Sequence, residues 1–289
     1  MSAKRAQQDQ SAIKSLRLAV GAAGQRPRVS AGLQSEYEMF IEQQIESYKD
    51  SLARADILAI GEEALTELTH SQALQVTEGV LREQVDEIVR RRLRVPSYRR
   101  WRVKHLQLRA AQVQPAHWGL TVSDPVVDLA ELIQDQDPVL VIGAADGACA
   151  LFLAARGALV HVCDPDVAAV YGLESRAVTE QLGASIECTV VQLERFEPFA
   201  WFIACVIETS TLANMTARNR AALIGRLKTT TPQGGRHAIM PWSDARLSRD
   251  AVRTLYGDWA IMASQVGHGA RKARNAGFMA VRPLAGQKP

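Results

Sequence analysis

The sequence has no long hydrophobic run. None of its apolar stretches approaches the roughly 18 residues that a membrane-spanning helix needs. The first residues also lack the apolar core of a secretory signal peptide. We therefore expect a cytoplasmic protein that has no membrane partner.

Cysteine is scarce, with four residues in 289, at Cys149, Cys163, Cys188 and Cys205. Their spacing is not that of a metal site, so we predict no bound metal. All four fall in apolar segments, which favours reduced core residues over disulfides. The formal net charge of +3 is too small to indicate a partner by itself.

Acidic residues are absent from one long stretch, residues 88–123, although residues 36–87 carry thirteen acids against three basic residues. Basic residues fill part of this acid-free stretch: Arg90, Arg91, Arg92, Arg94, Arg99, Arg100, Arg102, Lys104 and Arg109, interleaved with Tyr98, Trp101 and His105. Basic and aromatic side chains together can bind RNA or DNA. An anionic small substrate, or pairing with the acidic helices, explains the same pattern.

The chain divides by composition into three parts. Residues 1–34 hold six basic residues, one acid and no aromatic residue, which predicts a disordered basic tail. Residues 35–110 predict a helical domain, beginning with a capping box of Ser35 and Glu38. Further helices are expected over 53–68 and 71–93. Residues 111–289 predict an α/β domain.

The α/β domain is organised around residues 138–166. An apolar run over 139–142 predicts a strand, and the small-residue turn Gly143-Ala144-Ala145-Asp146-Gly147 follows it. A short helix over 148–156 ends at Gly157, and a second strand ends at Asp164-Pro165. This βαβ unit is typical of nucleotide-binding sheets, although a βαβ step without a ligand has the same pattern.

Alternating helices and strands are expected in the rest of the domain. Helices are predicted over 125–133, 167–182 and 216–228, strands over 185–193, 201–207 and 237–241, and a closing antiparallel pair over 255–264 and 275–282.

The turn is a poor match to the dinucleotide fingerprint Gly-x-Gly-x-x-Gly. Gly143-x-Ala145-x-Gly147 resembles motif I of class I S-adenosylmethionine-dependent methyltransferases. Trp118-Gly119-Leu120 before it, and Leu153 to Gly157 in the first helix, resemble the tellurite-resistance and thiopurine small-molecule branch. The resemblance covers about residues 115–283. It implies a Rossmann-like seven-stranded methyltransferase sheet, preceded here by a small all-α N-terminal domain.

The resemblance implies S-adenosylmethionine as the cofactor and a set of residues that bind it: Gly143, Ala144, Ala145, Asp146, Gly147, Asp164, Pro165, Gln192, Leu193 and Trp118. In such enzymes the acid at Asp164 holds the ribose hydroxyls. Gln192 stands where the family has an acid at the adenine amine, with Leu193 next to it. Trp118 is expected near the cofactor, or else pins its segment to the domain.

Methyl transfer depends mostly on positioning, because the sulfonium is already a reactive electrophile. Glu208 and His117 are the candidates for a catalytic base, and a structural role is the alternative for each. The predicted function is methylation of a small molecule or RNA. Three positions depart from the family pattern: Val141 stands where the family commonly has an acid two residues before the first glycine, Ala145 replaces the middle glycine, and Gln192 replaces the acid after the third strand. A degenerate binding or scaffold module is therefore the alternative. A nicotinamide-dependent oxidoreductase is disfavoured by the missing fingerprint.

Overall fold

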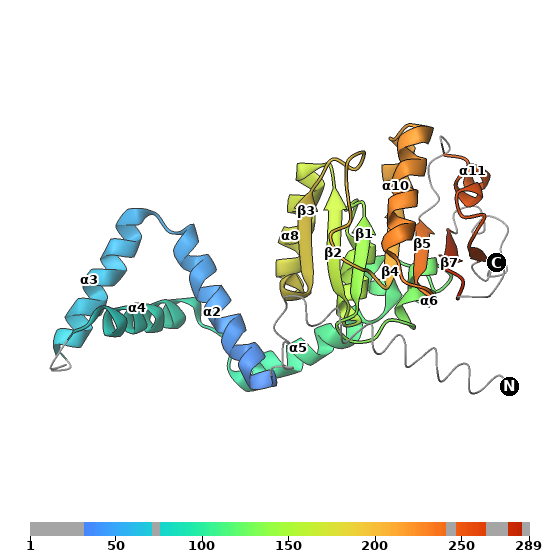
Figure 1. The fold of residues 1–289 in the computed structure, drawn as a ribbon. Helices are drawn as coiled ribbons and strands as arrows, with labels where there is room; N and C mark the ends of the chain where they lie inside the picture. The colour runs from blue at the N-terminus through green and yellow to red at the C-terminus, as the bar shows by residue number, and fades with distance from the viewer. Residues whose placement is uncertain (1–31, 71–75, 241–246, 264–276, 285–289) are drawn as a thin grey trace. The chain divides into compact units, whose positions relative to one another are not determined.

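A computed structural model describes residues 32–70, 76–240, 247–263 and 277–284 (Figure 1). Most of the predicted basic tail, residues 1–31, lies outside the described residues. The chain forms two compact units that divide between Leu108 and Arg109, close to the boundary predicted after residue 110. In the described part of the chain, no helix is long and apolar enough to cross a membrane. A cytoplasmic location stays a prediction.

The first unit is helical. It contains α2 (Leu33–Ser51), α3 (Arg54–His70), α4 (Glu78–Leu93) and most of α5 (Tyr98–Gln112). Its small core takes one apolar face from each of the first three helices, namely Ile41, Ile45, Ile60, Ala64, Ile88 and Val89. In α5, Trp101 is buried, and its ring lies 4.4 Å from that of His105.

Two helix starts differ from the prediction. The capping box at Ser35 was wrong, because α2 begins at Leu33 and its N-cap is Gly32. The helix predicted from residue 71 begins at Glu78, where the Thr77 hydroxyl accepts the Val80 N–H. A hydroxyl at the N-cap satisfies an N–H that has no partner inside the helix, which explains this later start. Residues 71–75 lie outside the described residues.

The second unit contains a seven-stranded sheet in the order β3-β2-β1-β4-β5-β7-β6. The strands are β1 (Pro138–Ile142), β2 (Leu159–Asp164), β3 (Ile186–Val190), β4 (Ala204–Glu208), β5 (Arg236–Met240), β6 (Ala260–Ala263) and β7 (Phe278–Val281). The first five strands are parallel, and β7 is antiparallel to both β5 and β6. This confirms the predicted Rossmann-like sheet with its closing antiparallel pair.

Helices cover both faces of the sheet (Figure 1). The helices are α6 (Pro125–Ala130), α7 (Ala148–Ala155), α8 (Val167–Thr179), α9 (Thr209–Ala213), α10 (Ala217–Thr230) and α11 (Arg249–Thr254). The first three share one core with the strands, and the last three share the other. The sequence analysis missed α9 and α11, which are too short to show a helical period.

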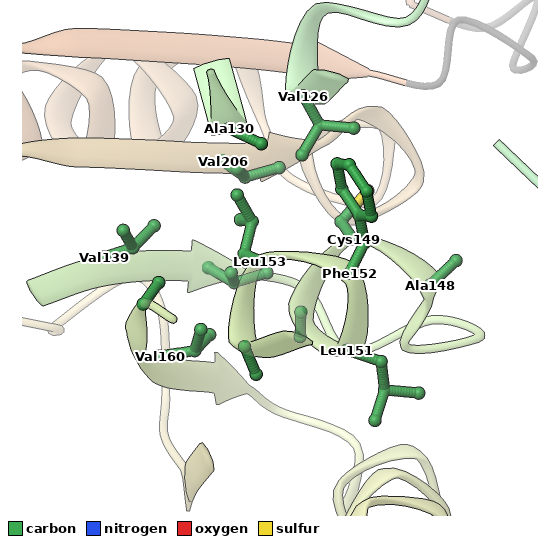
Figure 2. Close-up of a cluster of buried hydrophobic side chains, with 14 of the residues drawn as sticks. Val126, Ala130, Val139, Ala148, Cys149, Leu151, Phe152, Leu153, Val160 and Val206 are labelled. Carbon is green, nitrogen blue, oxygen red and sulfur yellow. The ribbon is translucent and has the colours of Figure 1, made fainter. Parts of the chain in front are cut away.

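The first of these cores surrounds α7. Every residue from Ala148 to Ala154 is buried, so the helix has no face for water. Figure 2 shows Cys149 and Phe152 of this helix beside Val126 of α6. Because α7 is packed on all sides, the glycine turn that precedes it has a fixed position.

All four cysteines are free, as predicted. Cys149, Cys163 and Cys205 are buried, and Cys188 is half-buried. Burial raises the pKa of the Cys163 thiol to about 12 and that of Cys188 to about 11. These thiols are therefore protonated at neutral pH and serve as core residues.

The second core contains one buried polar network. The imidazole of His237 lies 2.8 Å from the Thr231 hydroxyl through Nε2 and 2.8 Å from the Tyr256 hydroxyl through Nδ1. Burial lowers the pKa of His237 to about 3, so the ring is neutral. Both ring nitrogens have partners, so we assign this network to the stability of the fold.

Candidate functional site at the carboxyl ends of β1, β2 and β4

The strand order reverses between β1 and β4. From β1 the chain continues outward to β2 and β3, and it then returns to place β4 on the other side of β1. In open α/β sheets, ligands bind outside the carboxyl ends of the strands at this kind of reversal. Here β1 ends in the turn that begins at Gly143, and β4 ends in Glu208.

Gly143 is in close contact with β4 and α9. It is buried and has a φ of +102°, a backbone angle that residues other than glycine rarely adopt. A Cβ atom at this position would lie 2.5 Å from Thr211 Oγ1 and 2.9 Å from Glu208 Cβ. The glycine therefore lets the turn and the end of β4 approach each other.

Two further residues of the turn have positive φ. Gly147 has a φ of +72°, and a Cβ atom there would lie 2.6 Å from Leu173. Ala145, where the family has its middle glycine, has a φ of +30°. The alanine stores backbone strain there, since a left-handed conformation costs a residue with a Cβ about 1–2 kcal/mol. Ala145 and Asp146 are exposed at the tip of the turn.

Asp164 braces the turn from the end of β2. Its Oδ2 accepts the Ala144 N–H at 2.6 Å, and its Oδ1 accepts the Asp166 N–H at 2.7 Å. The carboxylate is buried. The sequence analysis assigned Asp164 to the ribose hydroxyls alone, whereas the structure shows that both oxygens also hold the backbone of the site.

Glu208 is the most unusual residue at this edge. It is only 2% exposed, and within the described part of the chain its Oε2 has no hydrogen-bond partner. Burial, together with the nearby charges of Asp146 and Asp164, raises the pKa of its carboxyl to about 8. The carboxyl is therefore mostly protonated at neutral pH.

Glu208 lies close to the position of the acid that the sequence lacks at Val141. Val141 pairs with Val206 across β1 and β4, and both valines belong to the core around α7. Glu208 follows Val206 by two residues, so it lies on the same face of the sheet and beside Gly143. Glu208 thus places a carboxyl group on the neighbouring strand β4, two residues beyond the partner of Val141.

The predicted adenine residues lie beyond β3, which ends at Val190. Gln192 is exposed, and Leu193 is buried in the second core. Pro165 is exposed after the end of β2. An exposed amide can reach a ligand at this edge, whereas the Leu193 side chain is occupied by core packing.

Trp118 packs in the core. It belongs to the short 3-10 helix η1 (Pro115–Trp118) and is 4% exposed. Its indole N–H donates to the Gln112 carbonyl at 2.6 Å, and the Arg176 guanidinium lies 5.5 Å from its ring centre. These contacts support the second interpretation of Trp118, in which it pins its segment to the domain.

His117 packs against Trp118, with 4.6 Å between the two ring centres. Its Nε2 is 3.7 Å from Glu180, which follows the C-terminal end of α8. The role of His117 as a catalytic base stays a prediction.

Two supporting residues were missed by the sequence analysis. Arg176 Nη1 donates to the Asp146 carbonyl at 2.7 Å and so fixes the tip of the turn. Thr211 places its hydroxyl against Gly143. The run Thr209-Ser210-Thr211 after a buried strand could have indicated hydroxyl groups at this edge, but no pattern linked Arg176 to residues thirty positions earlier.

We expect Gly143→Val to lower the stability of the whole domain, and not only ligand binding. The valine would need a φ of +102° and would clash with Glu208 and Thr211. Backbone strain and overpacking together should cost about 3 kcal/mol. Thermal unfolding should show this loss, and Gly225→Ala is the control, because a Cβ at that exposed helical position meets nothing within 4 Å. An unchanged melting temperature in Gly143→Val would contradict the prediction.

No protein-family model matches the sequence. No curated protein matches it either. Solved structures similar to this one include TehB from Haemophilus influenzae, at 17% identity and a TM-score of 0.43, covering 54% of this chain and 61% of TehB. An rRNA methylase from Streptococcus thermophilus matches at 18% identity and a TM-score of 0.45, covering 59% of this chain and 98% of the methylase.

A third similar structure is the N-methyltransferase NodS from Bradyrhizobium japonicum. It matches at 16% identity and a TM-score of 0.44, covering 63% of this chain and 96% of NodS. This chain thus spans less than two thirds of TehB and nearly the whole length of the other two. These likenesses concern the fold and not the function.

Proposed function

We propose that the protein is an S-adenosylmethionine-dependent methyltransferase. The observation that carries this proposal is the meeting of a tight glycine turn with a buried carboxyl, one oxygen of which has no partner among the described residues, at the strand-order reversal between β1 and β4. Close backbone approach suits a nucleoside ligand. A carboxyl with an unsatisfied oxygen suits a ligand that carries positive charge.

The residues at this edge fit such a cofactor. When bound, S-adenosylmethionine supplies an electrophilic methyl group. Gly143 and Gly147 let the backbone approach it, and Asp164 holds the turn while keeping lone pairs for ribose hydroxyls. Gln192 is exposed where it can accept a hydrogen bond from an adenine amine. The packed core around α7 holds these groups still, which is the main demand of methyl transfer.

Calorimetric titration tests the cofactor. We expect S-adenosylmethionine and its demethylated product to bind with micromolar dissociation constants, about −8 kcal/mol. NAD should bind at least tenfold more weakly, because the turn lacks the dinucleotide fingerprint. Absence of binding by both S-adenosyl compounds would overturn the proposed function.

A non-catalytic binding or scaffold module is the second candidate. The strained Ala145 and the valine at position 141 favour it, because both depart from the pattern that resembles motif I. Such a module would still bind the cofactor. Transfer of a labelled methyl group to any acceptor, tested with small molecules and with RNA, separates an enzyme from a scaffold.

The basic residues of the helical unit divide into two groups. Arg91 pairs with Glu67 at 2.8 Å, Arg92 pairs with Glu63, and Arg90 pairs with Glu87 at 3.5 Å. The acidic helices therefore neutralise this part of the basic stretch. Arg99, Arg100, Arg102 and Lys104 are exposed on α5, and the ion pairs found in the described part of the chain involve none of them. We propose this second group as the surface for an anionic acceptor, with RNA as the candidate.

Replacing Arg99, Arg100 and Arg102 with alanine should weaken RNA binding in a salt-dependent way. Each neutralised phosphate releases counterions, so the slope of log affinity against log salt should fall by about two to three units. The matched control is Arg91→Ala with Arg92→Ala, which removes the ion pairs to Glu67 and Glu63. The control should lower the melting temperature and leave the slope unchanged. No RNA binding by the unmodified protein at low salt would contradict the prediction and favour a small acceptor.

A further inference from the structure

One oxygen of the buried Glu208 carboxyl, Oε2, has no hydrogen-bond partner in the described part of the chain. Glu208 is the N-cap residue of α9, yet its side chain makes no cap hydrogen bond there. Its Oε2 is buried and unsatisfied, whereas Asp164 at the end of β2 uses both of its oxygens. A buried polar group without a partner costs about 1–3 kcal/mol, so a group kept in this state is a candidate for ligand contact.

The groups that face Glu208 are acidic or neutral. Asp146 in the glycine turn and Asp164 at the end of β2 act on it electrostatically, and the buried thiol of Cys149 in α7 is near enough to sense its charge. Thr211 of α9 and the backbone of Gly143 complete the contacts. Three carboxyl groups around one turn favour a cationic ligand group.

A metal ion is a poor match to this arrangement. Among the described residues there is no group of three or more His, Cys, Asp or Glu side chains that could hold a metal ion. The Asp164 oxygens already accept backbone N–H groups, and a divalent ion needs several free oxygen ligands. A single ammonium group needs only one carboxylate and can donate its other hydrogens to backbone carbonyls.

We propose that Glu208 is the counter-ion for the α-ammonium group of the cofactor. This inference rests on the proposed function and assigns Glu208 to cofactor recognition instead of general base catalysis.

Proton release gives the direct test on the unmodified protein. Because its pKa is raised to about 8, Glu208 is mostly protonated at pH 7 in the ligand-free protein, and it should release that proton to solvent when the ammonium group binds. Titration with S-adenosylhomocysteine in buffers of different ionisation enthalpy should therefore show net proton release. The same titration with 5′-methylthioadenosine, which lacks the ammonium, should show almost none.

Glu208→Gln tests the residue. The variant should bind S-adenosylhomocysteine about 10- to 100-fold more weakly, because the charge-assisted hydrogen bond is lost. It should release no proton, and its affinity for 5′-methylthioadenosine should be unchanged. An amine analogue of S-adenosylhomocysteine that lacks only the carboxylate should behave like S-adenosylhomocysteine, which assigns the effect to the ammonium.

Several outcomes would overturn the proposal. Unchanged affinity for S-adenosylhomocysteine in Glu208→Gln would overturn this inference and leave the proposed function standing. If Glu208→Gln loses equal affinity for S-adenosylhomocysteine and for 5′-methylthioadenosine, Glu208 has a structural role only. Proton release on addition of Mg²⁺ alone would make the site a metal site. If neither S-adenosyl ligand nor 5′-methylthioadenosine binds, the proposed function itself fails.

Discussion

Glu208→Gln is expected to stabilise the ligand-free protein at pH 8 and to flatten its stability profile between pH 5 and pH 8. The folded protein holds the Glu208 proton up to a pKa of about 8, whereas the unfolded chain releases it near the ordinary value of 4.5. Between these values the folded state binds more protons than the unfolded state. The stability of the unmodified protein therefore falls as pH rises through this window.

The expected size follows from the same difference. Each pH unit in the window costs about 1.4 kcal/mol, so about 4 kcal/mol is lost by pH 8. A glutamine does not ionise, but its buried amide costs about 2 kcal/mol of its own. The variant should therefore be more stable at pH 8 by about 2 kcal/mol, and less stable than the unmodified protein below pH 5.

Urea unfolding at each pH unit from 5 to 8 measures this effect. The exposed Glu194→Gln is the control, because it makes the same substitution at a residue that is not buried. It should leave the slope of stability against pH unchanged. If the profiles of Glu208→Gln and the unmodified protein run parallel, the carboxyl is ionised in the fold and the prediction fails.

Much of the α/β unit could be predicted from its sequence because local patterns decide it. The apolar run before Gly143, the buried helix after Gly147 and the strand ending in Asp164 each have the length and composition of the element they form. The helix start at Ala217 was found within one residue, because its cap is the hydroxyl of Thr216. The exact strand ends were less predictable, since neighbouring strands determine where pairing stops.

The roles of individual site residues were harder to predict, because they depend on contacts between distant parts of the chain. Trp118 and His117 are adjacent in sequence to a resembling motif, yet their partners are Gln112, Arg176 and Glu180. Conversely, nothing in the sequence placed Glu208 against Gly143, sixty-five positions earlier, because only the return of the chain to β4 brings them together.

Asp164→Ala is expected to destabilise the fold as well as weaken cofactor binding. The substitution removes the acceptors of the Ala144 and Asp166 N–H groups at once. Hydrogen bonds to a charged acceptor contribute about 1.5–3 kcal/mol each, and part of this is regained from water, so we expect a loss of about 3 kcal/mol. Asp164→Asn keeps one acceptor oxygen and should lie between the unmodified protein and the alanine variant.

Asp166→Ala is the matched control for the fold. It removes only the N-cap of α8, where the Asp166 side chain accepts the Ala168 N–H at 2.8 Å, and should cost about 1 kcal/mol. Chemical unfolding should show the largest loss of stability in Asp164→Ala, a smaller loss in Asp164→Asn and the smallest in Asp166→Ala. Equal losses for Asp164→Ala and Asp166→Ala would show that the brace on the glycine turn contributes little.

A ribose contact needs a separate measurement, because a loosened turn also lowers affinity. The 2′-deoxy analogue of S-adenosylhomocysteine removes one ribose hydroxyl from the ligand side. If Asp164 accepts that hydroxyl, the analogue should bind the unmodified protein about tenfold more weakly, and this penalty should shrink in Asp164→Asn, where the charged acceptor is replaced by a neutral one. A penalty of the same size in both proteins would leave Asp164 as the brace of the turn and place the ribose on other residues.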